Sequence, residues 1–295
     1  MTLIGIIIAL VCEHMLSHVE RWREHAWYMT YARWVHARLP VPALWNSAWG
    51  LLPLLLPLLI LVGLLQVGLR DGIDVLLALP LAVLILLLCL GPRDIAEELN
   101  SYFEARARGD DEALQRIERD LCTGPGRLHE CDAQGRLVRA VLLQAHERLF
   151  GVLLWFFVFG PFGAVLYRLA ASLPRVLTAL GAGERLHQAA RWLHAVLAWA
   201  PAHLVAALYG LAGSTDDALK AWRAVGTGEY DWQARTWRVL TEVGCGALQI
   251  EDDLSGQTLT QDSDSALHGA LALIQRTLVI LLGLFALFTI GGLLS

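Results

Sequence analysis

Charged residues are scarce in this sequence, and lysine is nearly absent. Aspartate, glutamate, lysine and arginine make up 17% of the 295 residues, whereas 56% are hydrophobic and the mean hydropathy is +0.50. This composition excludes an ordinary soluble domain and indicates a membrane protein. Lys220 is the single lysine among 23 basic residues, and the arginines alternate with acids in a chain of net charge −5. Without a basic patch, no nucleic-acid partner is expected.

Cysteine pairs and common catalytic motifs are also missing. The five cysteines stand at positions 12, 89, 122, 131 and 245, an odd number that does not suggest a disulfide framework, and their spacing matches no zinc pattern. The chain contains no GxxxxGK[ST], GxSxG, HExxH or paired CxxC motif. Nucleotide, hydrolase and zinc chemistry therefore lack support, and we predict no cofactor, no metal and no catalytic residue from these motifs.

Long apolar runs are what the sequence has instead. A transmembrane helix needs about 20 mainly apolar residues, and residues 43–69, 73–90, 149–170 and 271–294 meet this requirement. Residues 3–16 and 192–212 are two further candidates that carry polar groups, so they should line a bundle interior or lie at the interface. Tryptophans near the predicted ends suggest interfacial anchors: Trp27, Trp34, Trp45, Trp49, Trp192 and Trp199.

Basic residues in the connections predict the orientation. With six spans, residues 18–42, 91–148 and 213–275 would share the cytoplasmic side, and residues 70–72 and 171–191 would lie opposite. With four spans, the connection at 171–191 changes sides. Residues 3–16 lack a preceding basic residue and a small-residue cleavage site, so we expect a first helix rather than a signal peptide.

The predicted fold is all-α, a polytopic membrane helical bundle with a cytosolic helical insertion. We divide it into N-terminal transmembrane helices (1–91), the cytosolic insertion (92–148), central transmembrane helices (149–212), a cytosolic helical segment with an acidic linker (213–270) and a C-terminal transmembrane helix (271–295). A glycine-containing loop at 123–135 falls inside the insertion, and the acidic stretch at 251–265 reads as a mobile linker.

The insertion itself shows helical periodicity. Residues 94–121 predict two helices separated at Gly109, and the second begins with acids that suit a helix N-terminus. An amphipathic helix from residue 137 should continue into the span at 149, which would hold Glu147 and Arg148 at the membrane boundary. Alternatively, Arg148 is a plain interfacial anchor with a neighbouring acid. Pro161, between two glycines, predicts a kink or break in that span.

Acidic residues gather around these membrane entries. We expect Asp94, Glu97, Glu98 and Asp110 to form a cytosolic-side pocket with Glu147 that binds a small ligand or a partner. The competing interpretation of Asp94, Glu97 and Glu98 is simple helix N-terminal chemistry, in which each acid contributes about 0.3–1 kcal/mol.

Several motifs together resemble the AmpE family of inner-membrane proteins. They are GPRDIAEELNSYFEA, the turn at 108–110, HERLFGVLLWFFVFGPFGAVLYRL and LAWAPAHL, and they lie between residues 91 and 211. The resemblance implies a regulatory role in the response to β-lactams and in β-lactamase induction linked to cell-wall recycling.

The same stretch is similar to the CbiB/CobD enzymes, which join an aminopropanol unit to a corrinoid carboxylate. Gln144 falls at their motif asparagine, Glu147 at their aspartate, and Tyr167 at the tyrosine of their GG-x-x-GA-x-x-Y segment. The chain departs from the enzymes at Leu143, which replaces a glutamate, and at 171–174, where an NTLDS-like segment is missing. Such a ligase needs oxygen ligands for metal and phosphate, so the departures count against that activity.

We therefore consider three functions, of which the first is preferred and the third is least favoured. The first is a multi-pass inner-membrane regulator or sensor that contacts lipid, a small-molecule or cell-wall-derived ligand at the cytosolic side, and a protein partner in cell-wall recycling. The second is a CbiB/CobD-like amide-forming membrane enzyme of the adenosylcobinamide-phosphate synthase type. The third is a small-molecule transporter, suggested by His14, Arg168 and His203 in apolar or broken helices but supported by no inverted repeat.

Overall fold

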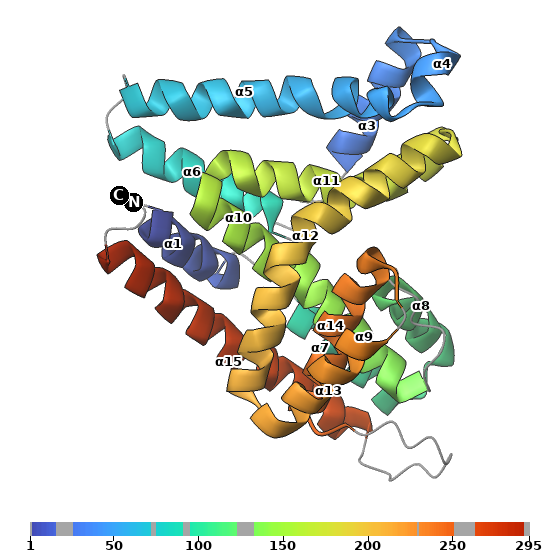
Figure 1. The fold of residues 1–295 in the computed structure, drawn as a ribbon, viewed down its shortest axis with the longest axis vertical. Helices are drawn as coiled ribbons and strands as arrows, with labels where there is room; N and C mark the ends of the chain where they lie inside the picture. The colour runs from blue at the N-terminus through green and yellow to red at the C-terminus, as the bar shows by residue number, and fades with distance from the viewer. Residues whose placement is uncertain are drawn as a thin grey trace. The chain divides into compact units, whose positions relative to one another are not determined.

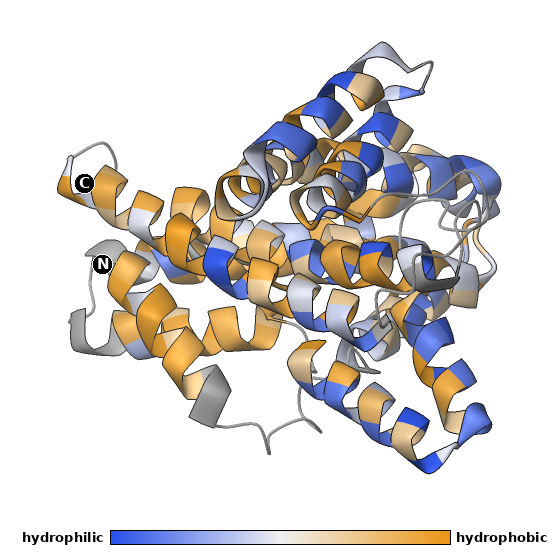
Figure 2. Cartoon of the chain, turned by 90° about the horizontal axis from the view of Figure 1, so that it is seen from below, coloured by the Kyte–Doolittle hydropathy of each residue, from blue (hydrophilic) through white to orange (hydrophobic). Residues whose placement is uncertain are grey.

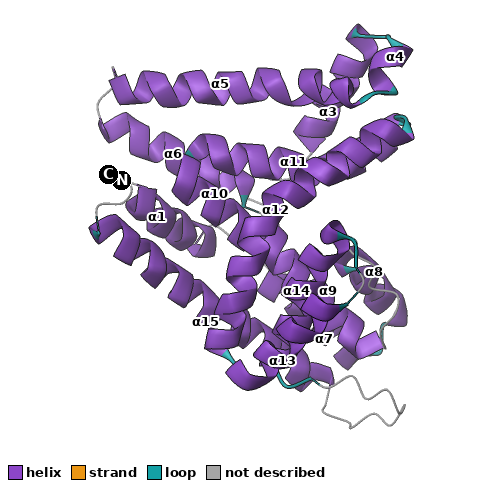
Figure 3. Cartoon of the chain, in the orientation of Figure 1, coloured by secondary structure: helices purple, strands orange, loops and turns teal. Residues whose placement is uncertain are grey.

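Helices joined by short loops make up the described residues, and no strand occurs among them (Figure 3). A computed structural model of the protein describes residues 2–15, 26–71, 75–90, 95–122, 133–228, 230–250 and 263–291. The all-α prediction is confirmed. Asp94, most of the loop at 123–135 and most of the acidic stretch at 251–265 lie outside the described residues.

The chain forms two compact units. Unit 1 comprises Met1–Pro92 and Gly151–Ala198, and unit 2 comprises Arg93–Phe150 and Trp199–Leu293. The helices of unit 1 are α1 (Thr2–Met15), α3 (Ala26–Arg38), α4 (Pro42–Trp45), the 3₁₀ turn η1 (Ala48–Gly50), α5 (Leu51–Asp71), α6 (Val75–Cys89), α10 (Gly151–Phe159), α11 (Pro161–Leu180) and α12 (Glu184–Ala212) as far as Ala198 (Figure 1).

One end of unit 1 has a continuous core. The buried face of α3 packs on α5, α11 and the start of α12 through a cluster that includes Tyr28, Leu54, Leu173 and Leu186. Trp45 belongs to this cluster, is only 5% exposed, and donates its indole N–H to the carbonyl of Leu39 at 2.7 Å. The prediction that Trp45 is an interfacial anchor is therefore wrong, because its ring fills the core.

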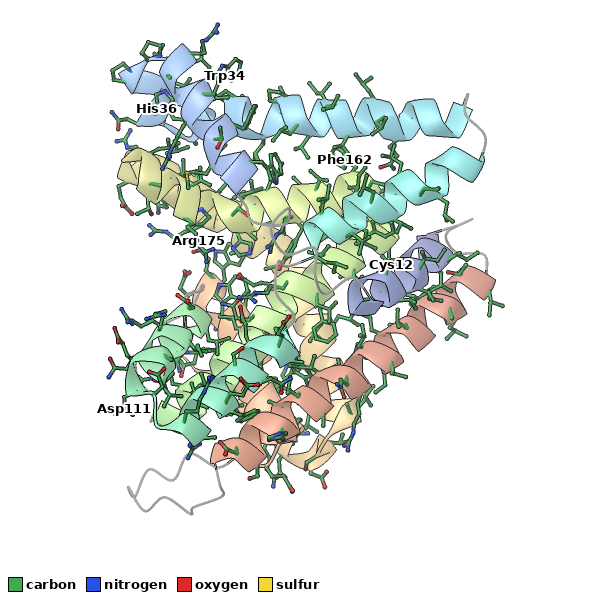
Figure 4. The ribbon with its side chains drawn as sticks, turned by 180° about the vertical axis from the view of Figure 1, so that it is seen from behind. Cys12, Trp34, His36, Asp111, Phe162 and Arg175 are labelled. Carbon is green, nitrogen blue, oxygen red and sulfur yellow. The ribbon has the colours of Figure 1, made fainter. Side chains whose placement is uncertain are left out.

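The expected break in the apolar run at residues 149–170 is present at Gly160. This glycine has φ +67° and separates α10 from α11, so residues 149–170 do not form the single spanning helix that the sequence predicted. The side-chain amide of Gln66 in α5 bridges the gap, because it donates to the carbonyl of Phe159 at 3.1 Å and accepts from the N–H of Phe162 at 3.0 Å. The ring of Phe162 lies against α5 near Gly63 (Figure 4). A neighbouring helix thus satisfies the backbone groups that the break exposes.

Two prolines inside helices, Pro57 and Pro201, are compensated in a similar way. Pro57 has no N–H to donate to the carbonyl of Pro53, and the hydroxyl of Tyr31 donates to that oxygen at 2.9 Å. The indole N–H of Trp155 likewise donates to the carbonyl of Leu197, which has no helical partner because Pro201 in α12 lacks an N–H. These side chains satisfy two carbonyls that would otherwise have no partner in an apolar environment.

Within the described residues, four helical stretches are long and apolar enough to cross a membrane: Ala48–Gly68, Gly135–Phe159, Glu184–Ala212 and Asp264–Ile290. They correspond to the predicted runs at 43–69, 149–170, 192–212 and 271–294, with the second displaced toward the N-terminus by the break at Gly160. Leu3–Cys12 and Ala78–Cys89 are shorter apolar helices. Figure 2 shows the first helix, beside the N mark, as almost entirely hydrophobic.

The six-span orientation is wrong in one respect. It placed residues 18–42 and 171–191 on opposite sides of the membrane, but Gly183 donates its N–H to the carbonyl of Trp45 at 3.1 Å. The ring of His36 in turn contacts Trp45, with centroids 4.7 Å apart. Both connections therefore lie at the same end of unit 1, which the six-span orientation does not allow.

Unit 2 contains the predicted helical hairpin. Its helices are α7 (Ile95–Arg108), α8 (Asp111–Leu121), α9 (Ala133–Ala145), the π-helix η3 (His146–Phe150), α12 from Trp199, α13 (Thr215–Thr227), α14 (Trp232–Ala247) and α15 (Ser263–Ile290). Gly109, with φ +67°, separates α7 from α8, as expected. Asp110 caps α8 by accepting the N–H of Ala113 at 3.0 Å.

Two further contacts organise unit 2. Arg139 of α9 meets Glu242 of α14 in a two-point ion pair, with nitrogen–oxygen distances of 3.2 and 3.0 Å. At the start of α15, Arg106 pairs with Asp264 at 2.6 Å and the rings of Phe103 and His268 stack at 4.5 Å. The first contact fastens α9 to α14, and the second fastens α15 to α7.

Candidate functional site

A half-buried ion pair joins α7 to η3. Nη1 of Arg148 lies 3.0 Å from Oε1 of Glu98, and the two side chains are 18% and 12% exposed. The pair connects residues that are 50 positions apart in the sequence. Because water is largely excluded, this attraction is screened less than that of a surface pair.

Gln144 completes the surroundings of Arg148. Its side-chain oxygen accepts from Nε of Arg148 at 2.9 Å, and its amide donates to the carbonyl of Leu121 at 3.1 Å. Leu121 is the last residue of α8, so this bond satisfies one of the carbonyls left without a partner at a helix end. The buried Gln144 therefore orients the guanidinium and ties it to the end of the hairpin.

Glu147 lies beside this cluster on a local distortion of the helix. The helical path from α9 into α10 is continuous, as predicted, but residues 146–150 form a π-helix that the sequence did not reveal. Glu147 is half-buried there, and the buried ring of His146 meets Trp237 of α14 edge to face at 6.0 Å. Short π-helical turns inside α-helices occur frequently at functional sites.

The remaining predicted acids lie elsewhere. Glu97 is exposed in the first turn of α7, and Asp110 is exposed and serves as the N-cap of α8. Asp94 lies outside the described residues. Of the predicted residues in unit 2, the structure therefore brings Glu98 and Gln144 onto one arginine, with Glu147 next to that arginine in the sequence.

Tyr167 belongs to unit 1. Its side chain is fully buried and packs directly over Gly151, where a β-carbon would collide with the ring. The ring also meets His194 of α12 edge to face, with centroids 5.9 Å apart. The glycine is what permits this close approach.

The cluster in unit 2 can recognise polar groups. Arg148 presents fixed N–H donors, and Oε2 of Glu98 is buried and has no hydrogen-bond partner within the described part of the chain. A buried acceptor of this kind gains most from a ligand that donates to it. No group of three or more metal-binding side chains occurs among the described residues.

Sequence reasoning treated Arg148 as an anchor or a neighbour of Glu147, and it missed the partners. The spacing of four residues between Gln144 and Arg148 is a signal that could have been used, since such residues face each other on a helix. Glu98 could not have been paired with Arg148 from spacing. Gln66 and Trp155 were missed for the same reason, because their contacts join distant segments.

The helices and this cluster define a multi-pass α-helical membrane protein that combines apolar spans with a half-buried polar centre. The family model described as "Regulatory signalling modulator protein AmpE" matches residues 1–295. The chain belongs to the AmpE family.

Curated relatives were found among cobalamin proteins. The chain is 32% identical over 163 residues to the cobalamin biosynthesis protein CobD of Stutzerimonas stutzeri, covering 55% of this chain and 53% of that protein. It is 31% identical over 164 residues to the CobD protein of Chromobacterium violaceum, covering 55% and 51%. The chain thus matches about half the length of these relatives. No solved structure matches it.

Proposed function

We propose that the protein is an inner-membrane regulator that takes part in the response to β-lactams and in β-lactamase induction linked to cell-wall recycling. The observation that carries this proposal is the match to the AmpE family over all 295 residues. The four span-capable helices and the excess of arginine in the connections are consistent with a multi-pass protein of the bacterial plasma membrane.

The ligand of this regulator binds at the centre formed by Glu98, Gln144 and Arg148, with Glu147 beside it, on the cytosolic side. The partly buried guanidinium suits a carboxylate, and the buried Oε2 of Glu98 suits an amide N–H or a hydroxyl. Peptide-bearing fragments of the cell wall offer all of these groups. The exposed Glu97 and Asp110 lie outside this centre and are available to a protein partner, and Tyr167 supports the membrane helices.

The test is complementation of a clean deletion strain. We would measure β-lactamase induction and the levels of cell-wall fragments with wild type, Glu98→Gln, Glu147→Ala and Glu147→Gln. Glu104→Gln is the matched control, because Glu104 is an exposed acid on the same helix as Glu98. Membrane abundance of each variant would be measured by immunoblot.

The expected result is loss of induction in the Glu98 and Glu147 variants at normal abundance, with the control unchanged. Unchanged induction in the deletion strain itself would overturn the regulatory role. Induction that is lost on deletion and restored by every variant would retain the regulatory role and reject this ligand site.

A CobD-like amide-forming activity is the second candidate, favoured by the 32% identity to a cobalamin biosynthesis protein. Two departures from the enzymes count against this activity. Leu143 replaces a motif glutamate, and residues 171–174 lack the amide and the acid of the NTLDS-like segment. Location of the gene beside a cell-wall amidase would favour regulation, and location within a cobalamin cluster would favour the enzyme. Amide formation on a corrinoid carboxylate by purified membranes would establish the second candidate.

A further inference from the structure

Helix α3 has one face in the core of unit 1 and an outer face of unusual composition. Tyr28, Ala32 and Val35 are buried in the core cluster, so the orientation of the helix is fixed. The outer face carries Trp27 and Trp34, which are 52% and 56% exposed, together with the exposed Arg33 and Arg38. Figure 4 shows Trp34 and His36 on this helix at the upper left of the view.

The described helix is too short to cross a membrane. It has 13 residues and therefore measures about 20 Å, less than the roughly 30 Å of hydrocarbon. It lies just before the span-capable stretch Ala48–Gly68, whose second residue, Trp49, is 69% exposed. An apolar and basic helix at the beginning of a span has the character of a helix that lies in the interface plane.

Charge at this end of unit 1 is opposite to that of the whole chain. Residues 26–50 contain no aspartate or glutamate, although the protein has a net charge of −5. Gly183, between α11 and α12, bonds to Trp45 of this region. The adjoining ends of these two helices add Arg175, Arg185 and Arg191 and one acid, Glu184, which is paired with Arg191. Arg38 also lies over the ring of Trp34, 5.3 Å from its centroid, so the cation and the aromatic ring form one surface.

We infer that the outer face of α3 binds the headgroups of anionic phospholipids through Arg33 and Arg38, with Trp27 and Trp34 inserted at the boundary of the acyl chains. The indole rings prefer this depth, and the guanidinium groups neutralise lipid phosphates there. The bilayer is the occupant, rather than a protein, because the face adjoins the start of a spanning helix and carries no acid.

The test uses the full-length protein, purified in a neutral detergent and titrated separately with phosphatidylglycerol and phosphatidylcholine, with bound lipid measured by native mass spectrometry. Arg33→Gln with Arg38→Gln is the test variant. Arg116→Gln with Arg223→Gln is the matched control, because both arginines are exposed on helices of unit 2. Equal unfolding temperatures without added lipid would show that all three proteins are folded.

The wild type should bind phosphatidylglycerol more tightly than phosphatidylcholine, and the preference should fall by roughly fivefold for each arginine removed from α3. The control should differ from wild type by less than about twofold, and raising the salt to about 0.5 M should remove most of the preference. A test variant that keeps the wild-type preference overturns the inference. An equal loss in the control also overturns it, because the effect would then reflect total charge.

Discussion

Trp155 donates its indole N–H to the carbonyl oxygen of Leu197 at a distance of 2.9 Å, and this carbonyl is the one that Pro201 leaves without its helical partner. In hydrocarbon such an oxygen would have no water to bond, at a cost of several kcal/mol. In the same way, the hydroxyl of Tyr31 donates to the carbonyl of Pro53, which has no helical partner because Pro57 lacks an N–H. At Pro57 and Pro201, therefore, a side chain of another helix supplies the donor that the proline lacks.

Trp155→Phe should destabilise the protein by about 1–2 kcal/mol, because the carbonyl of Leu197 loses its donor while most of the aromatic bulk remains. In a Pro201→Ala background the same substitution should cost much less, since the alanine N–H can donate to Leu197 directly. Thermal unfolding in detergent of the wild type, the two single variants and the double variant gives the coupling energy between Trp155 and Pro201. Trp192→Phe, at a 53% exposed site, is the control. Equal costs of Trp155→Phe in both backgrounds would contradict this account.

Gly160→Ala should cost more than Gly181→Ala. Both glycines have positive φ, +67° and +64°, but only Gly181, with ψ 33°, is in the left-handed helical region, where alanine costs about 1 kcal/mol. Gly160 has ψ −152°, a conformation that is essentially restricted to glycine, so the backbone strain of alanine is larger there. A β-carbon at Gly181 meets open space, whereas at Gly160 it would lie 3.2 Å from the Gln66 amide that bridges the helix break. Unfolding temperatures of the two variants, compared with Gln66→Leu, would test this. A larger loss at Gly181 would be inconsistent with the proposed role of Gln66.

The pair of Glu98 and Arg148 should couple more strongly than an exposed pair. Arg148→Ala leaves the largely buried carboxylate without its cation, and we expect a loss of about 2–3 kcal/mol. The matched cycle uses Arg108 and Glu104, which are 70% and 72% exposed and 3.5 Å apart, with an expected coupling below about 0.5 kcal/mol. Double-mutant cycles on unfolding free energy measure both. Similar couplings would mean that water screens the Glu98 pair as fully as the surface pair.

Acid should weaken the start of α13 through Asp217. Hydrogen bonds from Lys220, then Ser214 and Gln249, hold the pKa of this carboxyl below its usual range. Because the pKa is about 3.9 in an unfolded chain and lower in the folded one, the stabilisation is present above about pH 4 and is lost as the pH falls through the folded value. The difference in unfolding temperature between wild type and Asp217→Asn should therefore shrink from pH 5 to pH 3.

Asp216→Asn is the control for that experiment. Asp216 is exposed in the same first turn of α13 and experiences the same helix dipole, but it does not share the hydrogen bonds of Asp217. Asp216→Asn therefore controls for the removal of one carboxylate from this turn. A difference between wild type and Asp217→Asn that stays constant with pH would show that the hydrogen bonds do not favour the charged form.

Features that depend on neighbouring residues were predictable. The hairpin with its boundary at Gly109, the continuity of the helix through Arg148 and the break at Gly160 all follow from local periodicity and backbone chemistry. The π-helix at residues 146–150 was not predictable, because an extra residue in a helical turn leaves no mark in the hydrophobic pattern. The burial of Trp45 was missed because a tryptophan beside a span suits an interface and a core equally well.

By itself the sequence determined that this is a helical membrane protein, since apolar content and run length decide whether a segment prefers lipid. Only the tertiary structure decided how its polar groups are satisfied: Gln66 across the break at Gly160, Trp155 on Leu197, and Arg148 with Glu98. The hydrogen bond between Gly183 and Trp45 likewise decided which connections share an end of unit 1. The physical reason is that these contacts join segments tens of residues or more apart, and a buried polar group takes whichever partner the packed helices bring within reach.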